Sequence, residues 1–430
     1  MLLSLSLLGA TNEASAFCGH YAGQVGAELY NNASQIAVAR QDGRTTLTLV
    51  NDFEGDASEF AVVIPVPTVL GEEDVQVVDP SVVSRVDAYS APRLVTYECE
   101  DFSWGGDTGA ALDSANEEDD GGTGEDADDS VTVEATFSAG EYDIVILSAE
   151  ESGALITWLN DNGYGVSTDA EDLLGEYVSS GAKFFAAKVN LENIPEGASY
   201  LSPLQFGYES EVFSLPIRLG TLNSGGEQDL ILYVLSDNGQ THISNYPQVE
   251  VETDCMVDLS GWESLHAFVD DRFQIALSTE ERPGWVLEYG WTASGCDPCA
   301  DEPLADADVQ ALGWQGEAWD AYFSRIHMRY PPEAVDQDLV FYGSGLYDFT
   351  QIRYIEYVQD LEDRFPNCGS GWATDPGTCE GEDDTGNGPD RDLDEGMDAT
   401  PEPRNGCGVP LTPALGLALL AVPLARRRRR

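Results

Sequence analysis

Two acidic, low-complexity segments limit which parts of this chain can form a packed core. Residues 105–129 contain ten acidic residues and six glycines without lysine or arginine, and residues 375–402 contain eleven acidic residues against Arg391 alone. Neither segment can bury enough apolar surface to offset the entropy lost on ordering, so we predict disorder in both. The folded body is therefore expected over residues 17–365, with a disordered insertion at 105–130 and an acidic linker at 366–405.

The acidity is not confined to these two segments. The whole chain has 78 acidic and 20 basic residues, a formal net charge of −58, and its lysines are Lys183 and Lys188. A surface of this sign repels phosphate groups, so we expect no binding of nucleic acid and no docking on anionic lipid. Salt-rich surroundings, divalent cations and basic partners are compatible with it. Hydrophobic residues still make up 42% of the chain, which is enough for a sizeable core.

The N-terminal end has the pattern of an export signal. Leu2 to Ala10 is apolar but too short to span a bilayer, and Ala14-Ser15-Ala16 has the small residues of a cleavage site. We predict a signal peptide over residues 1–16 with cleavage between Ala16 and Phe17, although no lysine or arginine precedes the apolar run. A buried N-terminal strand is the alternative.

The C-terminal residues 406–430 have the pattern of a second targeting segment. Cys407 precedes an apolar stretch at 411–425 and five arginines, Arg426–Arg430. As a helix this stretch would cover ~22 Å, against a hydrocarbon core of about 30 Å. The arrangement resembles the myxobacterial-type, cysteine-containing C-terminal sorting signal, and the resemblance implies that Cys407 is the processing and anchoring position. An unprocessed membrane anchor is the alternative, and both interpretations place the body outside the cytoplasmic membrane.

Apolar residues in the body mostly alternate, which predicts β-structure with a few helices. Hairpins are expected at Asp42-Gly43 and Asn238-Gly239, because such dipeptides adopt the positive φ angles of tight turns. Further strands are predicted at 60–64, 131–137, 142–147, 183–189, 212–219, 285–291 and 325–330. Helices are predicted from Ser148 to Leu159, from Thr168 to Tyr177 and from Trp262 to Leu277. The fold class is therefore α+β with a mainly antiparallel sheet.

Several short motifs occur in order along the body. They include Phe17-Cys18-Gly19-His20-Tyr21, Ala91-Pro92-Arg93-Leu94, Cys296-Asp297-Pro298-Cys299 and Arg325-Ile326-His327-Met328-Arg329-Tyr330. Together they resemble a family of secreted bacterial proteins called domain of unknown function 2330, over about residues 17–365. The resemblance implies a single fold and export, and it implies no particular activity.

An exported chain is expected to hold most of its cysteines in disulfides. Cys296 and Cys299 have the CxxC spacing that redox sites and structural disulfides share. Asp301 and Glu302 follow closely and would raise the pKa of the thiols, so we favour a structural disulfide over a redox pair.

The other cysteines are less constrained by the sequence. Cys368 and Cys379 are expected to close a loop at the end of the body, and Cys255 is expected to be unpaired. The remaining connectivity cannot be deduced from spacing alone.

Two groups of residues are candidate ligand sites. Arg325, His327 and Arg329 alternate along a predicted strand and so share one face, where they could bind an anion or a substrate carboxylate. The alternative is pairing with acidic residues on neighbouring strands. Asp390, Asp392 and Asp394 have the alternate carboxylate spacing of calcium loops, but the sixth-position glycine and twelfth-position glutamate of an EF-hand are missing, so a plain linker is the alternative. Calcium is the only cofactor that the sequence suggests.

The sequence contains no HExxH, GxSxG, P-loop or GxGxxG motif. We therefore expect an exported, surface-anchored binding or structural module, with calcium as a candidate stabilising ion. The alternative is an extracytoplasmic enzyme, either a hydrolase at His327 or a thiol–disulfide enzyme at Cys296 and Cys299.

Overall fold

A computed structural model gives the structure of most of the body. It describes residues 20–21, 34–50, 61–95, 131–166, 170–190, 193, 201–224, 226–280, 282–296 and 299–356. The predicted cleavage site at Ala16 and Phe17, the insertion at 105–130, the linker, the C-terminal segment and the residues Cys368, Cys379, Asp390, Asp392, Asp394 and Cys407 lie outside the described residues. The chain divides into two units, Met1–Cys379 and Glu380–Arg430, and every described residue belongs to the first.

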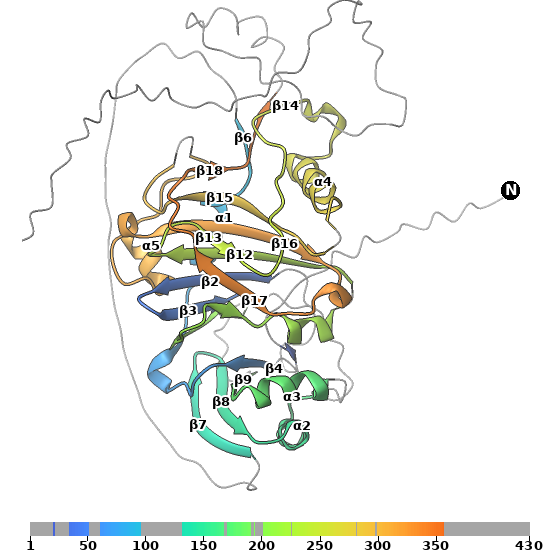
Figure 1. Ribbon diagram of the computed structural model, residues 1–430. Helices are drawn as coiled ribbons and strands as arrows, with labels where there is room; N and C mark the ends of the chain where they lie inside the picture. The colour runs from blue at the N-terminus through green and yellow to red at the C-terminus, as the bar shows by residue number, and fades with distance from the viewer. Residues whose placement is uncertain are drawn as a thin grey trace, which may run out of the picture. The chain divides into compact units, whose positions relative to one another are not determined.

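Strands dominate the described residues and pair mostly antiparallel, which confirms the predicted α+β class (Figure 1). The smaller of two large sheets contains, in spatial order, β1 (His20–Tyr21), β4 (Ala61–Val66), β9 (Lys183–Val189), β8 (Tyr142–Ala149) and β7 (Val131–Ala139). The larger contains β18 (Thr350–Gln351), β15 (Trp285–Thr292), β16 (Tyr322–Tyr330), β12 (Gln228–Ser236), β2 (Ser34–Gln41), β3 (Arg44–Leu49), β10 (Leu204–Glu209) and β5 (Val75–Val77).

Two three-stranded sheets, five α-helices and several short 3-10 helices complete the described elements. One small sheet is formed by β11 (Ser214–Leu215), β17 (Leu339–Gly343) and β13 (Thr241–Ile243), and the other by β14 (Met256–Val257), β19 (Arg353–Glu356) and β6 (Arg93–Val95). The helices are α1 (Ser81–Ser90), α2 (Ser152–Asp161), α3 (Glu171–Ser179), α4 (Leu265–Leu277) and α5 (Asp306–Ala311). Of the helices that the structure describes, none combines the length and apolar character that a membrane span needs.

The two large sheets share one apolar core because side chains alternate across each strand. On β2, Ile36 and Val38 belong to this core, whereas Ala37 and Ala39 face the opposite side. Across the core, Phe185 of β9 stacks on Phe206 of β10 with ring centroids 4.9 Å apart. The larger sheet is therefore covered on this face by the smaller one.

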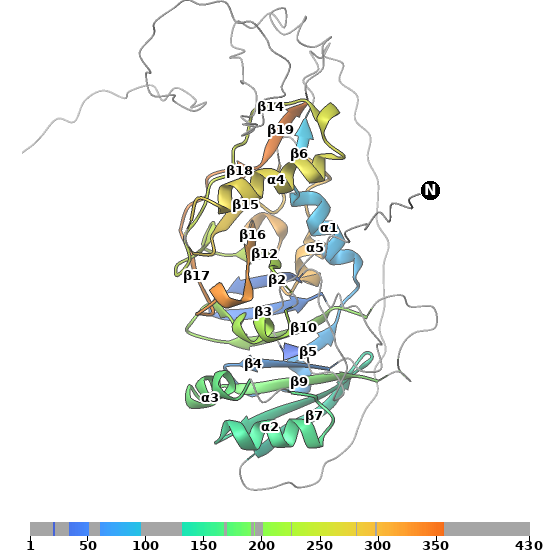
Figure 2. The ribbon, with the colours of Figure 1, turned by 90° about the vertical axis from the view of Figure 1, so that its right-hand side faces the viewer.

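Helices cover the remaining faces of both sheets (Figures 1 and 2). α2 and α3 pack on the smaller sheet, where Leu155, Leu159 and Leu174 are buried. α1 and α5 pack on the second face of the larger sheet, and α4 covers a separate cluster that includes Val286 of β15. The second face of β15 and β16 thus lies beneath α1 and α4 rather than in solvent.

The two predicted hairpins have different outcomes. β2 and β3 pair antiparallel across Asp42 and Gly43, whose φ angles are 51° and 87°, so the first hairpin is confirmed. The second is wrong, since β12 pairs with β16 and β2, and β13 pairs with β17. Both edges of β12 are occupied, so the chain leaves that sheet after the turn.

Several other boundaries differ from the sequence expectations. α2 begins after Glu151 because Ser148 belongs to β8, and α4 begins after Ser264, whose hydroxyl accepts a hydrogen bond from the N–H of Ala267. The strand expected at 212–219 is reduced to the two residues of β11, followed by a 3-10 helix at Arg218–Asn223. α1 and α5 were not predicted, although Val83, Val86 and Tyr89 give α1 a buried apolar stripe; α5 has only six residues.

Candidate functional site

The predicted positive stripe lies on the helix-covered face of the larger sheet. On β16, Ile326 and Met328 are buried in the core between the sheets, so Arg325, His327 and Arg329 project from the opposite face. The stripe exists as expected, but all three side chains are largely removed from solvent.

Glu288 lies on the same face, at a β-bulge in β15. The register of β15 against β16 shifts between Leu287 and Tyr289, so Leu287 packs in the inter-sheet core whereas Glu288 and Tyr289 both project toward the helix-covered face. Alternation already places Glu288 on this face, and the bulge redirects Tyr289, which would otherwise point into the inter-sheet core. The side chain of Glu288 is only 3% exposed and therefore needs a cationic partner.

His327 occupies the centre of a buried ionic network. Its Nδ1 lies 2.8 Å from Oε1 of Glu288, and its Nε2 lies 2.9 Å from Oδ1 of Asp229 on β12. The ring of Phe273 from α4 stacks on the imidazole, with centroids 3.9 Å apart and planes 9° apart. Both ring nitrogens and one face of His327 are thus occupied by the protein itself.

The two arginines extend the network in opposite directions. Arg329 donates to both oxygens of Asp229, at 2.8 and 2.6 Å, and contacts Asp270 of α4 at 2.8 Å. Arg325 donates to Glu288 at 2.5 Å and to Asp87 of α1 at 2.6 Å. The network therefore ties β12, β15 and β16 to the two helices above them.

The network shifts the ionisation of its central members. Burial opposes the charged form of His327, but the carboxylates of Glu288 and Asp229 outweigh it and raise the pKa of His327 to about 9. Burial would likewise raise the pKa of Glu288, but the charges of His327 and Arg325 lower it to about 2. At neutral pH both groups are charged and paired.

The partners of these three basic side chains are relevant to two candidate roles of the stripe, which are anion binding and hydrolysis with His327 as the base. The donors of Arg325, His327 and Arg329 point at carboxylates from two neighbouring strands and two helices. A general base needs a free nitrogen within reach of substrate, and neither nitrogen of His327 is free. The arrangement matches the alternative interpretation, in which the stripe pairs with acidic neighbours.

The CxxC pair forms a disulfide. Cys296 and Cys299 are bonded, with Cα atoms 5.0 Å apart, in the loop between β15 and α5. The pair precedes α5, which begins at Asp306, and does not cap the start of that helix. Cys255 is also disulfide-bonded, so the expectation that it is unpaired was wrong; its partner lies outside the described residues.

Within the part of the chain that the structure describes, no three histidine, cysteine, aspartate or glutamate side chains gather in a group that could hold a metal ion.

Several large apolar side chains of one short segment are exposed near the end of the described body. Tyr342, Leu346, Tyr347 and Phe349, here called the aromatic surface, are 48%, 46%, 57% and 65% exposed. Phe349 stacks on Trp291 of β15 at 4.2 Å, and Tyr347 packs edge-on against the buried Tyr322 at 5.7 Å. Exposed apolar clusters of this kind commonly mark interaction sites.

The loop that carries the aromatic surface is held firmly by its backbone. Gln240 donates its backbone N–H to the carbonyl of Leu346 and accepts from the N–H of Ser344, both at 2.8 Å, and its side chain donates to the carbonyl of Asp348 at 2.8 Å. Gly239, at φ +71°, is required here, because a Cβ atom would lie 2.1 Å from the carbonyl oxygen of Leu346. The exposed side chains are therefore presented in a fixed arrangement.

Sequence reasoning did not identify the aromatic surface. Aromatic residues are frequent between positions 285 and 322, and most of them are core: Trp285, Trp314, Tyr289 and Tyr322 are buried. The available signal was the apolar run Leu346-Tyr347-Asp348-Phe349 directly after the glycines at 343 and 345, where a turn normally carries polar residues.

Comparison with known proteins identifies the family. The model of the family DUF2330, described as an uncharacterized protein conserved in bacteria, matches residues 12–342. This protein belongs to that family. The match covers the ionic network and both large sheets except β18, and it ends at Tyr342, the first residue of the aromatic surface.

Other comparisons add little. No curated protein matches the chain. Among solved structures, the crystal structure of a mutated baculovirus P35 after caspase cleavage is similar over 74% of this chain and 99% of that chain, at 9% sequence identity and a TM-score of 0.25. At this level the likeness supports no statement about fold or function.

Removing the charge of Glu288 should destabilise the protein strongly. Glu288→Gln leaves the buried His327 and Arg325 without their shared carboxylate, and breaking a buried pair costs about 3–5 kcal/mol. Asp336→Asn is the control, because Asp336 pairs with Arg282 at the surface and should change the unfolding free energy by less than about 1 kcal/mol. Denaturant unfolding measures both, and an equal small effect would show that the network is not a stabilising element.

The stability should fall as the pH rises above neutrality. The folded pKa of His327 is about 9 and the unfolded value is lower, so its contribution is complete below about pH 6.5 and disappears as the pH rises through 9. Glu288 acts in the opposite direction, and its contribution is lost only as the pH falls toward about 2. Unfolding free energies between about pH 7 and pH 10 should decline more steeply for the wild type than for His327→Gln, and parallel curves would contradict the assignment.

Proposed function

We propose that this protein is an exported, surface-anchored binding module of the bacterial cell envelope. Export is supported by the signal-like sequence before Phe17, the sorting-like sequence around Cys407 and the disulfide between Cys296 and Cys299.

The observation that carries the binding role is the aromatic surface on its fixed loop. Large apolar side chains are normally buried, yet Tyr347 and Phe349 pack on Tyr322 and Trp291 with one side only and keep more than half of their surface exposed, on a loop tied down by Gln240. Rigid aromatic side chains lose little entropy on binding, which is why they dominate recognition surfaces.

The charge around the aromatic surface favours a basic protein segment as the partner. Residues 283–324, which include Trp291, and residues 330–352, which include the aromatic surface itself, contain acidic residues but no lysine, arginine or histidine. Arginine and lysine are attracted both to carboxylates and to the faces of aromatic rings. A partner with alternating basic and aliphatic side chains therefore complements this surface.

The enzymatic alternatives receive less support. His327 is committed to Glu288 and Asp229 through both ring nitrogens, which leaves no base for a hydrolase at this position. Cys296 and Cys299 lie next to Asp301 and Glu302, whose charges disfavour the thiolate that disulfide exchange requires.

The export proposal predicts the covalent state of the native protein. Intact mass spectrometry of protein isolated from the envelope should show a chain that begins at Phe17, and reduction should raise its mass by two hydrogens for each disulfide, including those of Cys255 and Cys296. A change beyond Cys407 would report processing at that residue. A full-length chain found reduced in the cytosol would overturn the proposal.

The binding proposal predicts that affinity depends on the aromatic surface and not only on net charge. We expect a short peptide of alternating leucine and arginine to bind the full chain, and the variant Tyr347→Ser/Phe349→Ser to bind it about tenfold more weakly, the loss of a modest hot spot. Val212→Ser is the control, because Val212 is 56% exposed and lies outside the aromatic surface. Fluorescence anisotropy at near-physiological salt measures all three proteins.

Two peptide controls separate the mechanisms. Replacing the leucines by glycine should weaken binding to the wild type, and replacing the arginines by neutral citrulline should weaken it further. If the double variant binds as well as the wild type, the attraction is only diffuse charge and the proposed surface is wrong. Binding of a neutral oligosaccharide such as cellohexaose, lost in the double variant, would instead assign the surface to sugars.

A further inference from the structure

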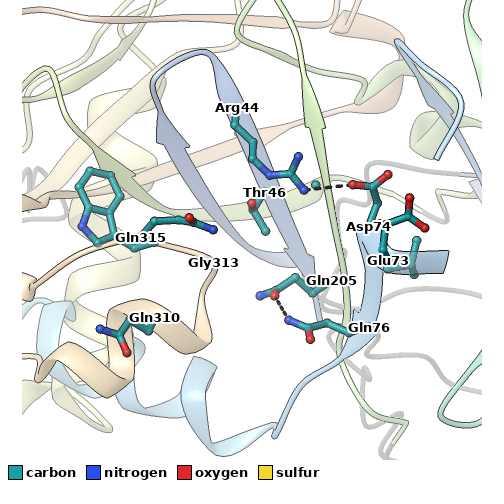
Figure 3. Close-up of a pocket in the computed structure, with 12 residues that line it drawn as sticks. Arg44, Thr46, Glu73, Asp74, Gln76, Gln205, Gln310, Gly313 and Gln315 are labelled. Atoms are coloured by element: carbon teal, nitrogen blue, oxygen red, sulfur yellow. Dashed lines mark hydrogen bonds and ion pairs between the residues drawn. The ribbon is translucent and has the colours of Figure 1, made fainter. Parts of the chain in front are cut away.

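A polar cavity of about 220 Å³ lies at the β5 end of the larger sheet, and it shares no residue with the ionic network or the aromatic surface. Its walls come from β3, β10 and β5, from the 3-10 helix at Glu72–Asp74, and from α5 with the loop that follows it (Figure 3). Four of its lining residues are glutamines: Gln76, Gln205, Gln310 and Gln315. Side-chain amides, which both donate and accept hydrogen bonds, therefore make up much of the polar lining of this cavity.

Two glycines create the space. Gly207 of β10 has no side chain, and the guanidinium of Arg44 lies over it, so that a Cβ atom there would be 2.6 Å from Nη2 of Arg44. Gly313 has a φ angle of +90° and brings its loop against Thr46, where a Cβ atom would be 2.5 Å from Cγ2. Larger residues at these two positions would fill the cavity or displace its walls.

Part of the amide set is fixed by cross-strand hydrogen bonds. Gln76 donates to Oε1 of Gln205 at 2.6 Å, and Gln205 donates to Oγ1 of Thr48 at 2.7 Å and to the carbonyl of Ala311 at 2.9 Å. These bonds use the amide N–H of Gln76 but leave its carbonyl oxygen without a partner among the described residues.

Other polar groups of the cavity are also available. Gln315 points from its loop toward Thr46 and Arg44 (Figure 3), and its side-chain amide has no hydrogen-bond partner within the described ranges. The cavity therefore offers both unused donors and unused acceptors.

The charges of the cavity are largely balanced. Arg44 pairs with Asp74 at 3.2 Å, which leaves Glu73 as the remaining charged side chain in the lining. An anionic ligand would meet Glu73 and the strongly acidic chain around it. Hydroxyl groups, which donate and accept, match the side-chain amides without introducing charge.

We propose that this cavity binds one neutral sugar unit, held by hydrogen bonds from its hydroxyls to Gln76, Gln315 and Arg44. The inference does not depend on the aromatic surface or its partner. Amide and guanidinium groups fix the orientation of the hydroxyls, and the small volume limits the ligand to about one ring. A site of this kind rejects ligands that lack the matching hydroxyls, because its polar groups would then be left unpaired.

The test is saturation-transfer NMR and calorimetric titration of the full chain with D-glucose, D-galactose and N-acetylglucosamine. Gln76→Ala and Gln315→Ala should each weaken binding of the preferred sugar about tenfold, and the double variant should abolish it. Gln76 and Gln315 are exposed, so their loss should leave the fold intact, as circular dichroism can verify. Gln248→Ala, at an exposed glutamine outside the cavity, should bind sugar like the wild type.

Two further ligands define the class. D-glucuronate should bind more weakly than D-glucose, and a blocked dipeptide, which presents amides without hydroxyls, should not compete with the sugar. The proposal is overturned if no sugar binds at concentrations near 0.1 M, a level at which even sites about a hundredfold weaker than millimolar would be partly filled. It is equally overturned if the two variants bind like the wild type, or if the blocked dipeptide or the glucuronate is the preferred ligand.

Discussion

The packing of β12, β15 and β16 beneath their covering helices depends on the ion pairs of His327 with Glu288 and Asp229. They join three adjacent strands on the face that α1 and α4 cover, and the arginines at 325 and 329 carry the same pairing into those helices. Charges this deeply buried are tolerable only when each has its partner, so the position of every element around them is fixed together. Alternation along β15 turns Glu288 toward the helices, and the adjacent bulge turns Tyr289 to the same face.

This network also explains how so acidic a chain can hold a stable sheet. Alternation along β16 gives one face to the core between the sheets and the other to charged groups, and the few arginines of the chain neutralise carboxylates where water is absent. The rest of the acidic side chains can remain in solvent, where their repulsion is screened by salt. The same sheet supports the aromatic surface through Tyr322 and Trp291, which pack against Tyr347 and Phe349.

Sequence reasoning succeeded where the physics is local. The Asp42-Gly43 hairpin, the strand alternation and the shared face of Arg325, His327 and Arg329 follow from turn geometry and from the period of a strand. It failed where the outcome depends on which strands and helices lie next to each other in space. The turn at Asn238-Gly239 forms, but β13 pairs elsewhere because β16 already occupies that edge of β12. No local signal places Asp87, Asp229 and Glu288, far apart in the chain, around one row of cations.

The sequence by itself determined the fold class, the acidic surface, the first hairpin and the alternation that puts one histidine between two arginines on a single face. Only the tertiary structure decided what that face does, because carboxylates from α1, α4, β12 and β15 meet it only after the strands have paired and the helices have packed. It also decided which aromatic residues are core and which are exposed, and it opened the glutamine-lined cavity between segments that are distant in sequence. Local structure depends on residues that are close together in the sequence and can therefore be predicted from it. A site depends on burial and on contacts between distant residues, and these exist only in the folded protein.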